Sequence, residues 1–405
     1  MVQQGGPNIR IGVAGLGPAF TNMMRELAAY PHGKVTAAAD VRQRGLDKFA
    51  SEWGGETFTT VEEMCASPNV DVVYVLTPDR FHAEHAIAAA EHGKHIILDK
   101  PMGQSLEECD RIIEAVERNH VRVVVGHSQS LDQPIIKMAE VVNSGQIGKP
   151  IMIHTSFFSD WVYRPRAAEE LDPALGGGIV RRQGPIQVDI ARMMGGGMVR
   201  SARAMTSVAD SNRPVEGSMV AYLEFEDSTP ATLVYSGYGH FDSTLHTWGV
   251  GLQGFEVDAS KHGQARKLLR DFTPEDEWAH KEETRYGGTK VGQTPHRGPD
   301  KRHAFFGVTV VECEHGSVRQ SPSGLTIYGN DEIEELPVSA GEEYGDRYTT
   351  SELNLLREAI ANDAPPRLHG PRWAKATQEV IFGILDSAAQ RKEVYFQHQV
   401  PFTGF

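Results

Sequence analysis

The residues with the clearest chemical signature lie near the N-terminus, where Gly15 and Gly17 follow a short apolar run and precede a segment of helical spacing. Glycines in such a turn serve many loops, but they also let backbone N–H groups approach a pyrophosphate at the positive end of a helix. Proline suits the first turn of that helix, and Phe20 stands where a third glycine is usual. We therefore expect a dinucleotide site lined by Gly15, Gly17, Pro18, Ala19 and Phe20.

A carboxylate, Asp40, ends the next apolar run of the sequence. At that place it can accept hydrogen bonds from both hydroxyls of a cofactor ribose and repel a 2′-phosphate. Without a cofactor it would be an ordinary solvated aspartate. Arg42 and Arg44 follow closely and could instead hold the 2′-phosphate of NADP. The position of Asp40 favours NAD, with Arg42 as a further contact.

Two ordered motifs follow, VYVLTPDRFH at residues 73–82 and HGKHIILDKP at residues 92–101. They resemble signatures of the Gfo/Idh/MocA oxidoreductase family, and the likeness continues through residues 145–148, 176–178 and 316–318. The resemblance implies an N-terminal Rossmann domain and a C-terminal α/β domain whose sheet commonly forms the subunit interface. Where the family has glutamate before its lysine, this chain has Asp99. The motifs extend the expected cofactor contacts to Thr77, Pro78, His82, Asp99, Lys100 and Pro101.

Lys100 is the expected catalytic residue of these motifs. A strand-end ammonium can hydrogen-bond a substrate oxygen and, with a depressed pKa, take part in proton transfer. Outside such a motif it would be a solvated loop lysine. His82 and His85 have a spacing that could face a metal, but no third ligand is placed nearby, so we expect packing or helix capping and no metal site.

The segment GGGIVRRQGPIQVD at residues 176–189 corresponds to the second-domain signature of the family, which places an aspartate, a histidine and a last aspartate around the reacting carbinol. Here Arg182 stands at the first aspartate, Ile186 at the histidine, and only Asp189 is retained. The family's sugar and inositol oxidation depends on that histidine as general base. The departure leaves three interpretations open: a sugar or inositol dehydrogenase using NAD or NADP, a nucleotide-binding regulator without catalysis, or a dehydrogenase that needs little help from a base.

Oxidation of an arene cis-dihydrodiol is a reaction of the last kind, because aromatisation of the product to a catechol supplies the driving force. An arginine at the reacting site suits a substrate carboxylate, which a guanidinium binds in a bidentate fork. The run RQGxxQxD resembles the phthalate 4,5-cis-dihydrodiol dehydrogenases of the family, which implies NAD-dependent oxidation to 4,5-dihydroxyphthalate. The expected substrate contacts are Arg164, Arg166, Arg182 and Trp161, with Gln187, Asp189 or water receiving the proton. Asp189 could equally cap a helix or form a salt bridge.

The elements that position these residues alternate in the first third of the chain. Short apolar runs at residues 9–14, 35–40, 72–76, 95–98 and 121–125, with a weaker one near residue 57, are separated by amphipathic segments. This pattern is typical of an α/β fold with a doubly wound parallel sheet. We predict this Rossmann domain over residues 1–126.

Longer strand-like runs follow at residues 219–226, 232–236 and 308–314, with helical segments at 134–144, 351–361 and 373–390. They indicate a second α/β domain with a large open, mostly antiparallel sheet, over residues 127–405, for substrate binding and oligomerisation. The polar stretch 258–303 fits a lid, an oligomer arm or a mobile excursion.

The composition narrows the partners. Forty Lys and Arg against 54 Asp and Glu give a net charge of −14, which repels nucleic acid and anionic lipid. The three cysteines have no C-x-x-C spacing, which argues against a disulfide framework or a zinc site. The N-terminus has no apolar signal segment. We expect a cytoplasmic homo-oligomer, dimer or tetramer, that acts on a small anionic molecule without nucleic acid, membrane or metal.

Overall fold

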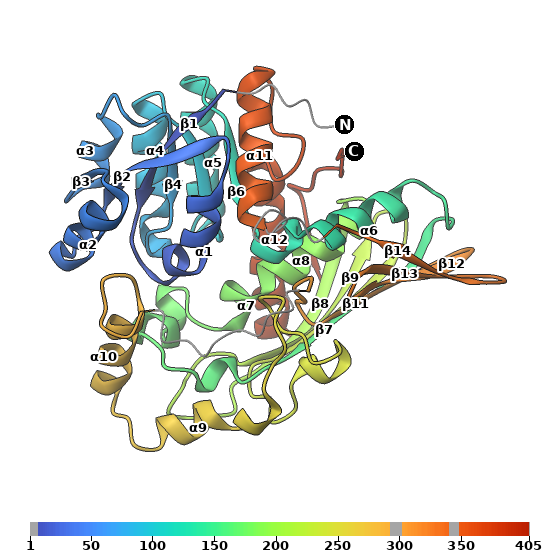
Figure 1. Ribbon diagram of the computed structural model, residues 1–405. Helices are drawn as coiled ribbons and strands as arrows, with labels where there is room; N and C mark the ends of the chain where they lie inside the picture. The colour runs from blue at the N-terminus through green and yellow to red at the C-terminus, as the bar shows by residue number, and fades with distance from the viewer. Residues whose placement is uncertain (1–6, 292–301, 340–347, 405) are drawn as a thin grey trace.

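The computed structural model of the chain describes residues 7–291, 302–339 and 348–404, which build two β-sheets with helices packed against them (Figure 1). The first sheet has the order β3-β2-β1-β4-β5-β6 with parallel pairing throughout its described strands. This is the Rossmann order. The predicted doubly wound sheet is therefore confirmed, and its strands are β1 (Ile9–Ala14), β2 (Gly33–Ala39), β3 (Glu56–Phe58), β4 (Val72–Val75), β5 (His95–Asp99) and β6 (Val123–Gly126).

Helices cover both faces of this sheet, which explains why its central strands are apolar on both sides. Leu16, Phe20 and Leu27 belong to one apolar cluster, and Ile112 and Val116 belong to the cluster on the other face. The helices of this region are α1 (Pro18–Ala29), α2 (Gln43–Trp53), α3 (Val61–Cys65), α4 (His82–Glu91) and α5 (Leu106–Arg118). Ser105 begins α5 by accepting a hydrogen bond from the Glu108 N–H, as a capping residue does.

The far end of the chain completes the first sheet. Helix α11 (Tyr348–Ala361) packs beside β6 and α1, with Leu353 and Leu356 buried in the same cluster as Phe20. The Tyr74 hydroxyl on β4 donates a buried hydrogen bond to Glu352 of α11. The predicted domain boundary after residue 126 stays a prediction, but α11 shows that residues beyond it belong to the first sheet's core.

The second sheet has the order β14-β13-β12-β11-β7-β10-β9-β8-β15, and β7 pairs with β10 in parallel while the other pairings between its described strands are antiparallel. The predicted large, mostly antiparallel sheet is thus confirmed. Its strands are β7 (Pro150–Phe158), β8 (Val199–Ser207), β9 (Ser218–Phe225), β10 (Pro230–Ser236), β11 (Val308–Cys313), β12 (Gly316–Ser321), β13 (Gly324–Gly329), β14 (Ile333–Pro337) and β15 (Val394–Tyr395).

One face of the second sheet is buried by α6 (Gln133–Asn143), α8 (Gly184–Met194) and α12 (Pro371–Gln390). Alternation along β9 leaves the other face open, where Met205, Val220 and Tyr222 are exposed. Three further helices of this part of the chain are α7 (Ile179–Arg182), α9 (Gln264–Leu269) and α10 (Pro274–Thr284), and Figure 1 shows α9 at the lower edge of the molecule and α10 below α1 and α2. The polar stretch that began at residue 258 is therefore helical in part, and residues 292–301 of it lie outside the described residues.

Cys65, Cys109 and Cys313 are free and buried. Among the helices that the structure describes, none combines the length and the apolar character needed to cross a membrane.

Candidate active site

The glycine loop after β1 has the geometry of a phosphate cradle. Gly15 adopts φ +96°, and a Cβ there would lie 2.8 Å from the carbonyl oxygen of Leu76, so a side chain would collide with the backbone. A Cβ on Gly17 would meet no atom within 4 Å. Helix α1 begins at Pro18 with no side chain capping its first turn, so the N–H groups of Ala19 and Phe20 remain available to an anion. These residues fit a dinucleotide pyrophosphate.

Asp40 is tied to this loop. Its carboxylate accepts hydrogen bonds from the backbone N–H of Leu16 at 2.7 Å and from that of Arg42 at 2.8 Å. The Arg42 guanidinium pairs with the same carboxylate and also donates to the carbonyl oxygen of Leu16 at 2.6 Å. Arg44 pairs with Glu283. Both arginines that could have held a 2′-phosphate are thus bonded to carboxylates, which favours NAD at this site.

The loops after β4 and β5 are held together by His82. One ring nitrogen lies 2.7 Å from the carbonyl oxygen of Pro101 and the other 2.9 Å from that of Thr77, and the side chain is buried. Pro78 lies between them at the start of a short 3₁₀ turn. His82 therefore bridges the two motif loops, which agrees with the packing expected for it. His85 contacts the Thr77 hydroxyl at 2.9 Å and no metal ligand is needed to explain it.

Lys100 and Arg182 meet where β5 and α7 end. The Lys100 ammonium donates a 2.8 Å hydrogen bond to the carbonyl oxygen of Arg182, the last carbonyl of α7. The preceding Asp99 accepts the Lys100 N–H, and burial raises the pKa of that carboxyl. Lys100 is thereby fixed at the carboxyl edge of the Rossmann sheet, where the ligands of such sheets bind.

The Arg182 side chain lies over the 3₁₀ turn that follows β4. One guanidinium nitrogen approaches Asp79 at 3.4 Å, and the buried Nε makes no hydrogen bond within the described residues. Its neighbour Arg181 instead lies over the ring of Phe382. The structure therefore brings Arg182, and not Arg181, together with Lys100. Asp79 is a site residue that sequence reasoning did not single out, although it stands inside the motif at residues 73–82.

Gln187 and Asp189 are fully buried on α8. The Gln187 amide donates to the carbonyl oxygen of Val234 on β10 at 3.1 Å. One oxygen of Asp189 accepts hydrogen bonds from the Trp373 indole at 2.6 Å and the Thr377 hydroxyl at 3.1 Å. These hydrogen bonds fit a structural role for Asp189, the alternative held open for it, and they give no support to proton transfer through either residue.

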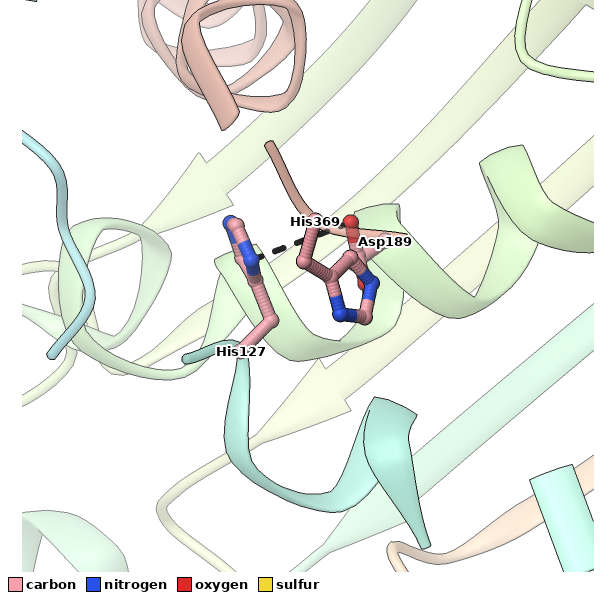
Figure 2. A group of neighbouring side chains, drawn as sticks. All are labelled: His127, Asp189 and His369. Atoms are coloured by element: carbon pink, nitrogen blue, oxygen red, sulfur yellow. Dashed lines mark ion pairs between the residues drawn. The ribbon is translucent and has the colours of Figure 1, made fainter. Parts of the chain in front are cut away.

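Figure 2 shows the two histidines that flank Asp189, His127 at the end of β6 and His369 before α12. His369 Nε2 lies 2.6 Å from Asp189 Oδ2, and His127 Nδ1 lies 4.0 Å from Oδ1. The positive charge of buried Arg192 lies close by, since Arg192 donates to the Thr377 hydroxyl at 2.7 Å. Burial alone would raise the pKa of the Asp189 carboxyl, but the neighbouring His369 and His127 hold it well below its usual range, and burial lowers the pKa of His127 to about 4.

The same three side chains have ligand atoms within 4.8 Å of one another, which is compatible with a bound metal ion. Two ligands of one tetrahedral zinc, each about 2.1 Å from the metal, would lie about 3.4 Å apart. The 2.6 Å contact between His369 and Asp189 is shorter and is that of a direct pair. With Asp189 also bonded to Trp373 and Thr377, the cluster is explained as a buried network that joins α8, β6 and α12.

The side chains of residues 161–166 that were expected to contact the substrate bond to one another and to neighbouring carboxylates. Arg166 lies 3.7 Å above the Trp161 ring, donates to the Trp161 carbonyl oxygen, and pairs with Glu170 at 3.0 Å. Trp161 is only 4% exposed, so the structure does not present it as a cover for a flat substrate ring. Arg164 is more open and pairs with Asp160. Lys281, which pairs with Glu170, brings a further cation to this group from α10.

Comparison with models of known protein families shows which family the chain belongs to. A model described as an oxidoreductase family with an NAD-binding Rossmann fold matches residues 9–127, and a Gfo/Idh/MocA C-terminal domain model matches residues 135–261. The chain belongs to the Gfo/Idh/MocA oxidoreductase family. Its first sheet is therefore part of an NAD-binding Rossmann domain, and the prediction of NAD as cofactor is confirmed.

Named relatives within this family differ in how much of the chain they match. The 1-carboxy-3-chloro-3,4-dihydroxycyclohexa-1,5-diene dehydrogenase of Comamonas testosteroni is 32% identical over 93% of this chain and 94% of its own length. The inositol 2-dehydrogenase of Salmonella paratyphi B is 29% identical over 36% of this chain and 45% of its own length. A solved structure from Bordetella bronchiseptica RB50 has 37% identity and a TM-score of 0.90, covering 96% of this chain and all of that one.

Proposed function

We propose that this member of the family is an NAD-dependent dehydrogenase that oxidises a carboxylated arene cis-dihydrodiol to the corresponding catechol, with the phthalate 4,5-cis-dihydrodiol as the type substrate. The observation that carries the proposal is the position of Arg182. Its backbone oxygen anchors the Lys100 ammonium, and its guanidinium Nε is buried without a hydrogen bond in the described structure. A guanidinium with a buried donor left open in this way favours an anionic ligand.

The Asp79 carboxylate does not cancel this preference. Its 3.4 Å separation from Arg182 is longer than the 2.7–2.9 Å of a charge-assisted hydrogen bond. A substrate carboxylate can thus pair with donors of Arg182 that Asp79 leaves open. Arg164 and Lys281 are already paired with Asp160 and Glu170, so Arg182 is the cation that this proposal assigns to the carboxylate.

The chemistry follows from these residues. Lys100 donates a hydrogen bond to the reacting hydroxyl of the substrate and sets its orientation. Arg182 holds the substrate ring by binding the substrate's carboxylate. NAD, when bound, supplies the acceptor for the hydride that leaves the hydroxyl-bearing carbon. The hydroxyl proton passes to water, because Gln187 and Asp189 are buried and bonded elsewhere. In the hydroxyketone that results, the proton on the remaining hydroxyl-bearing carbon is then transferred to the ketone oxygen, which gives the catechol, so no strong base is required.

Two further observations support this substrate over inositol. Ile186, which stands where the family has its catalytic histidine, is 3% exposed and belongs to the apolar core. A relative that is 32% identical over 93% of the chain is named for a carboxylated dihydroxycyclohexadiene, whereas an inositol 2-dehydrogenase that matches 79% of the chain is 26% identical. A polyol without aromatisation would need the base that Ile186 cannot provide.

The proposal is tested by substitution at Arg182. Losing a paired arginine should raise KM for the carboxylated dihydrodiol by on the order of tenfold to a hundredfold and leave an uncharged dihydrodiol nearly unaffected. Arg182→Lys should recover only part of the loss, because lysine keeps the charge without the fork. Equal effects of Arg182→Ala on charged and neutral dihydrodiols would show that Arg182 does not bind the carboxylate.

Enzyme and regulator are separated by Lys100. Lys100→Ala should lower turnover by orders of magnitude and leave NADH affinity within a few-fold, because its contact is with the substrate side. A regulator would show no NAD reduction with any substrate and no effect of the variant.

The oligomeric state, dimer or tetramer, is likewise proposed. The open face of the second sheet, with Val220 and Tyr222 exposed, would supply its interface, and light scattering of the purified protein measures it.

A further inference from the structure

The polar excursion of the second domain returns to the nucleotide-binding edge of the first. Tyr286, just after α10, is fully buried and packs edge-on against Phe20, with ring centroids 5.0 Å apart. Its backbone N–H donates to the Thr21 hydroxyl at 2.9 Å, and its own hydroxyl donates to Glu52 at 2.7 Å. A residue more than 200 positions away in sequence is thus anchored between α1 and α2.

The backbone around Tyr286 docks as closely as its side chain. Arg42, which holds Asp40 and the glycine loop, also donates to the Tyr286 carbonyl oxygen at 2.9 Å. A Cβ on Gly287, which has φ +87°, would come 3.0 Å from the Cα of Gly45 at the start of α2. Glu283 pairs with Arg44 beside it. The turn therefore lies on the same edge as Asp40 and the first turn of α1.

The other end of the segment is fixed to the second domain. Glu277 of α10 accepts hydrogen bonds from the Arg213 guanidinium at 2.6 Å and from the Arg166 backbone N–H at 2.8 Å. Lys281 pairs with Glu170. Figure 1 shows α10 below α1 and α2, away from the second sheet. One short segment thus joins the loop that carries Arg166 to the edge where the adenosine ribose of NAD would lie.

We propose that residues 273–291, here called the cofactor strap, are part of the dinucleotide site and that Tyr286 is its latch. With the latch docked, the strap holds Arg42 against Asp40 and closes the adenosine edge of the site. NAD and NADH then exchange only when Tyr286 leaves the groove between α1 and α2. Since the strap also bonds the loop at residues 161–170, its release loosens both domains at once. Of the three roles that the sequence leaves open for this stretch, the proposal adopts the lid.

With NAD bound, Arg285 would give the strap a contact of its own with the cofactor. Its guanidinium pairs with Glu282, and its buried Nε makes no hydrogen bond in the part of the chain that the structure describes. It immediately precedes the residue whose carbonyl oxygen holds Arg42. A donor left open at this edge suits a ribose hydroxyl or a phosphate oxygen.

The experiment measures NADH release by stopped-flow fluorescence, without any substrate, so that its result does not depend on the proposed dihydrodiol activity. Tyr286→Ala should raise the dissociation rate constant by about tenfold or more, as expected for the loss of a buried aromatic anchor. Tyr286→Phe, which keeps the ring and loses only the bond to Glu52, should change it much less. His280→Ala, on the strap but in contact with Phe272, is the matched control and should leave it unchanged.

Hydrogen exchange on the wild-type protein provides a second readout that needs no variant. NADH binding should slow exchange of the strap amides of Tyr286, Gly288 and Lys290, whose N–H groups are bonded in the docked turn. A folded Tyr286→Ala protein that releases NADH within twofold of the wild-type rate would overturn the proposal. So would strap amides whose exchange does not respond to NADH.

Discussion

Replacing Asp189 by asparagine separates a structural role for this residue from a catalytic one. The substitution keeps the size of the side chain and an oxygen for Trp373 and Thr377, but it removes the negative charge. That charge is fully buried and faces His369 at 2.6 Å, with Arg192 also fully buried nearby. Removing one partner of a buried ion pair costs about 3–5 kcal/mol, because the remaining charge is left uncompensated.

The expected loss for Asp189→Asn is therefore about 3 kcal/mol of unfolding free energy at neutral pH. With an unfolding entropy of about 2.1 cal/mol/K per residue, a chain of 405 residues loses about 1.2 °C of Tm for each kcal/mol, so Tm should fall by about 3–4 °C. Because the pKa of Asp189 is lowered in the folded state, its stabilisation is complete above the unfolded pKa of about 3.9 and is lost as pH falls further. The difference between variant and wild type should accordingly shrink in acid.

Urea unfolding followed by circular dichroism gives the stability, and NAD reduction well below Tm gives the activity. Asp110→Asn is the matched control, since Asp110 pairs with Lys375 of α12 but its side chain is 50% exposed, and its loss should cost less than about 1 kcal/mol. We expect Asp189→Asn to keep most of its turnover. A variant of near wild-type stability whose turnover collapses would refute the structural role and restore Asp189 as proton acceptor.

Three further predictions concern the cofactor and the buried titrating groups. Asp40→Ser should weaken NADH binding by roughly tenfold and narrow the preference for NADH over NADPH, because the ribose hydroxyls lose the carboxylate that accepts their hydrogen bonds. Fluorescence titration with both nucleotides measures this, and an unchanged preference would contradict the role of Asp40. The pKa of His127 is about 4 in the folded protein and about 6.5 in the unfolded chain, so between these values only the unfolded chain binds the proton. The unfolding free energy should therefore fall by up to about 1.4 kcal/mol for each pH unit from pH 6.5 to pH 4. The urea midpoints of His127→Gln should lack this component. Burial raises the pKa of Glu352 to about 8, so its contribution to the unfolding free energy is complete below the unfolded pKa of about 4.3 and is lost as pH rises towards 8. The unfolding free energy of Glu352→Gln should therefore rise relative to that of the wild type between pH 5 and pH 8. A difference between the two proteins that does not change with pH would be inconsistent with a protonated Glu352.

The parts of the fold that the sequence predicts are those with local, periodic signals. Continuous apolar strands and the motif loops locate the Rossmann sheet to within two residues at each strand end, and the Gly15 turn and Asp40 are placed at the cofactor edge. Lys100 also lies where its motif places it. Each of these features depends on neighbouring residues in sequence, so the pattern carries the information.

The contacts that the sequence does not reveal are long-range. Nothing in the residues around Trp161 and Arg166 shows that the two stack on each other and satisfy each other's polar groups. The excursion after residue 258 has no periodicity to place Tyr286 between α1 and α2. The position of α11 on the first sheet depends on packing across more than 200 residues. Such partners become visible only when the chain is folded.

The measurement that tests the central claim most directly is the formation of NADH, followed by its absorbance, when the purified protein and NAD meet three substrates: a carboxylated arene cis-dihydrodiol, its uncharged counterpart and myo-inositol. The account predicts rapid reduction of NAD with the carboxylated dihydrodiol, a kcat/KM at least about tenfold lower with the neutral one, as expected for the lost arginine contact, and none with inositol. Turnover of inositol or of the neutral dihydrodiol as efficient as that of the carboxylated one would contradict it.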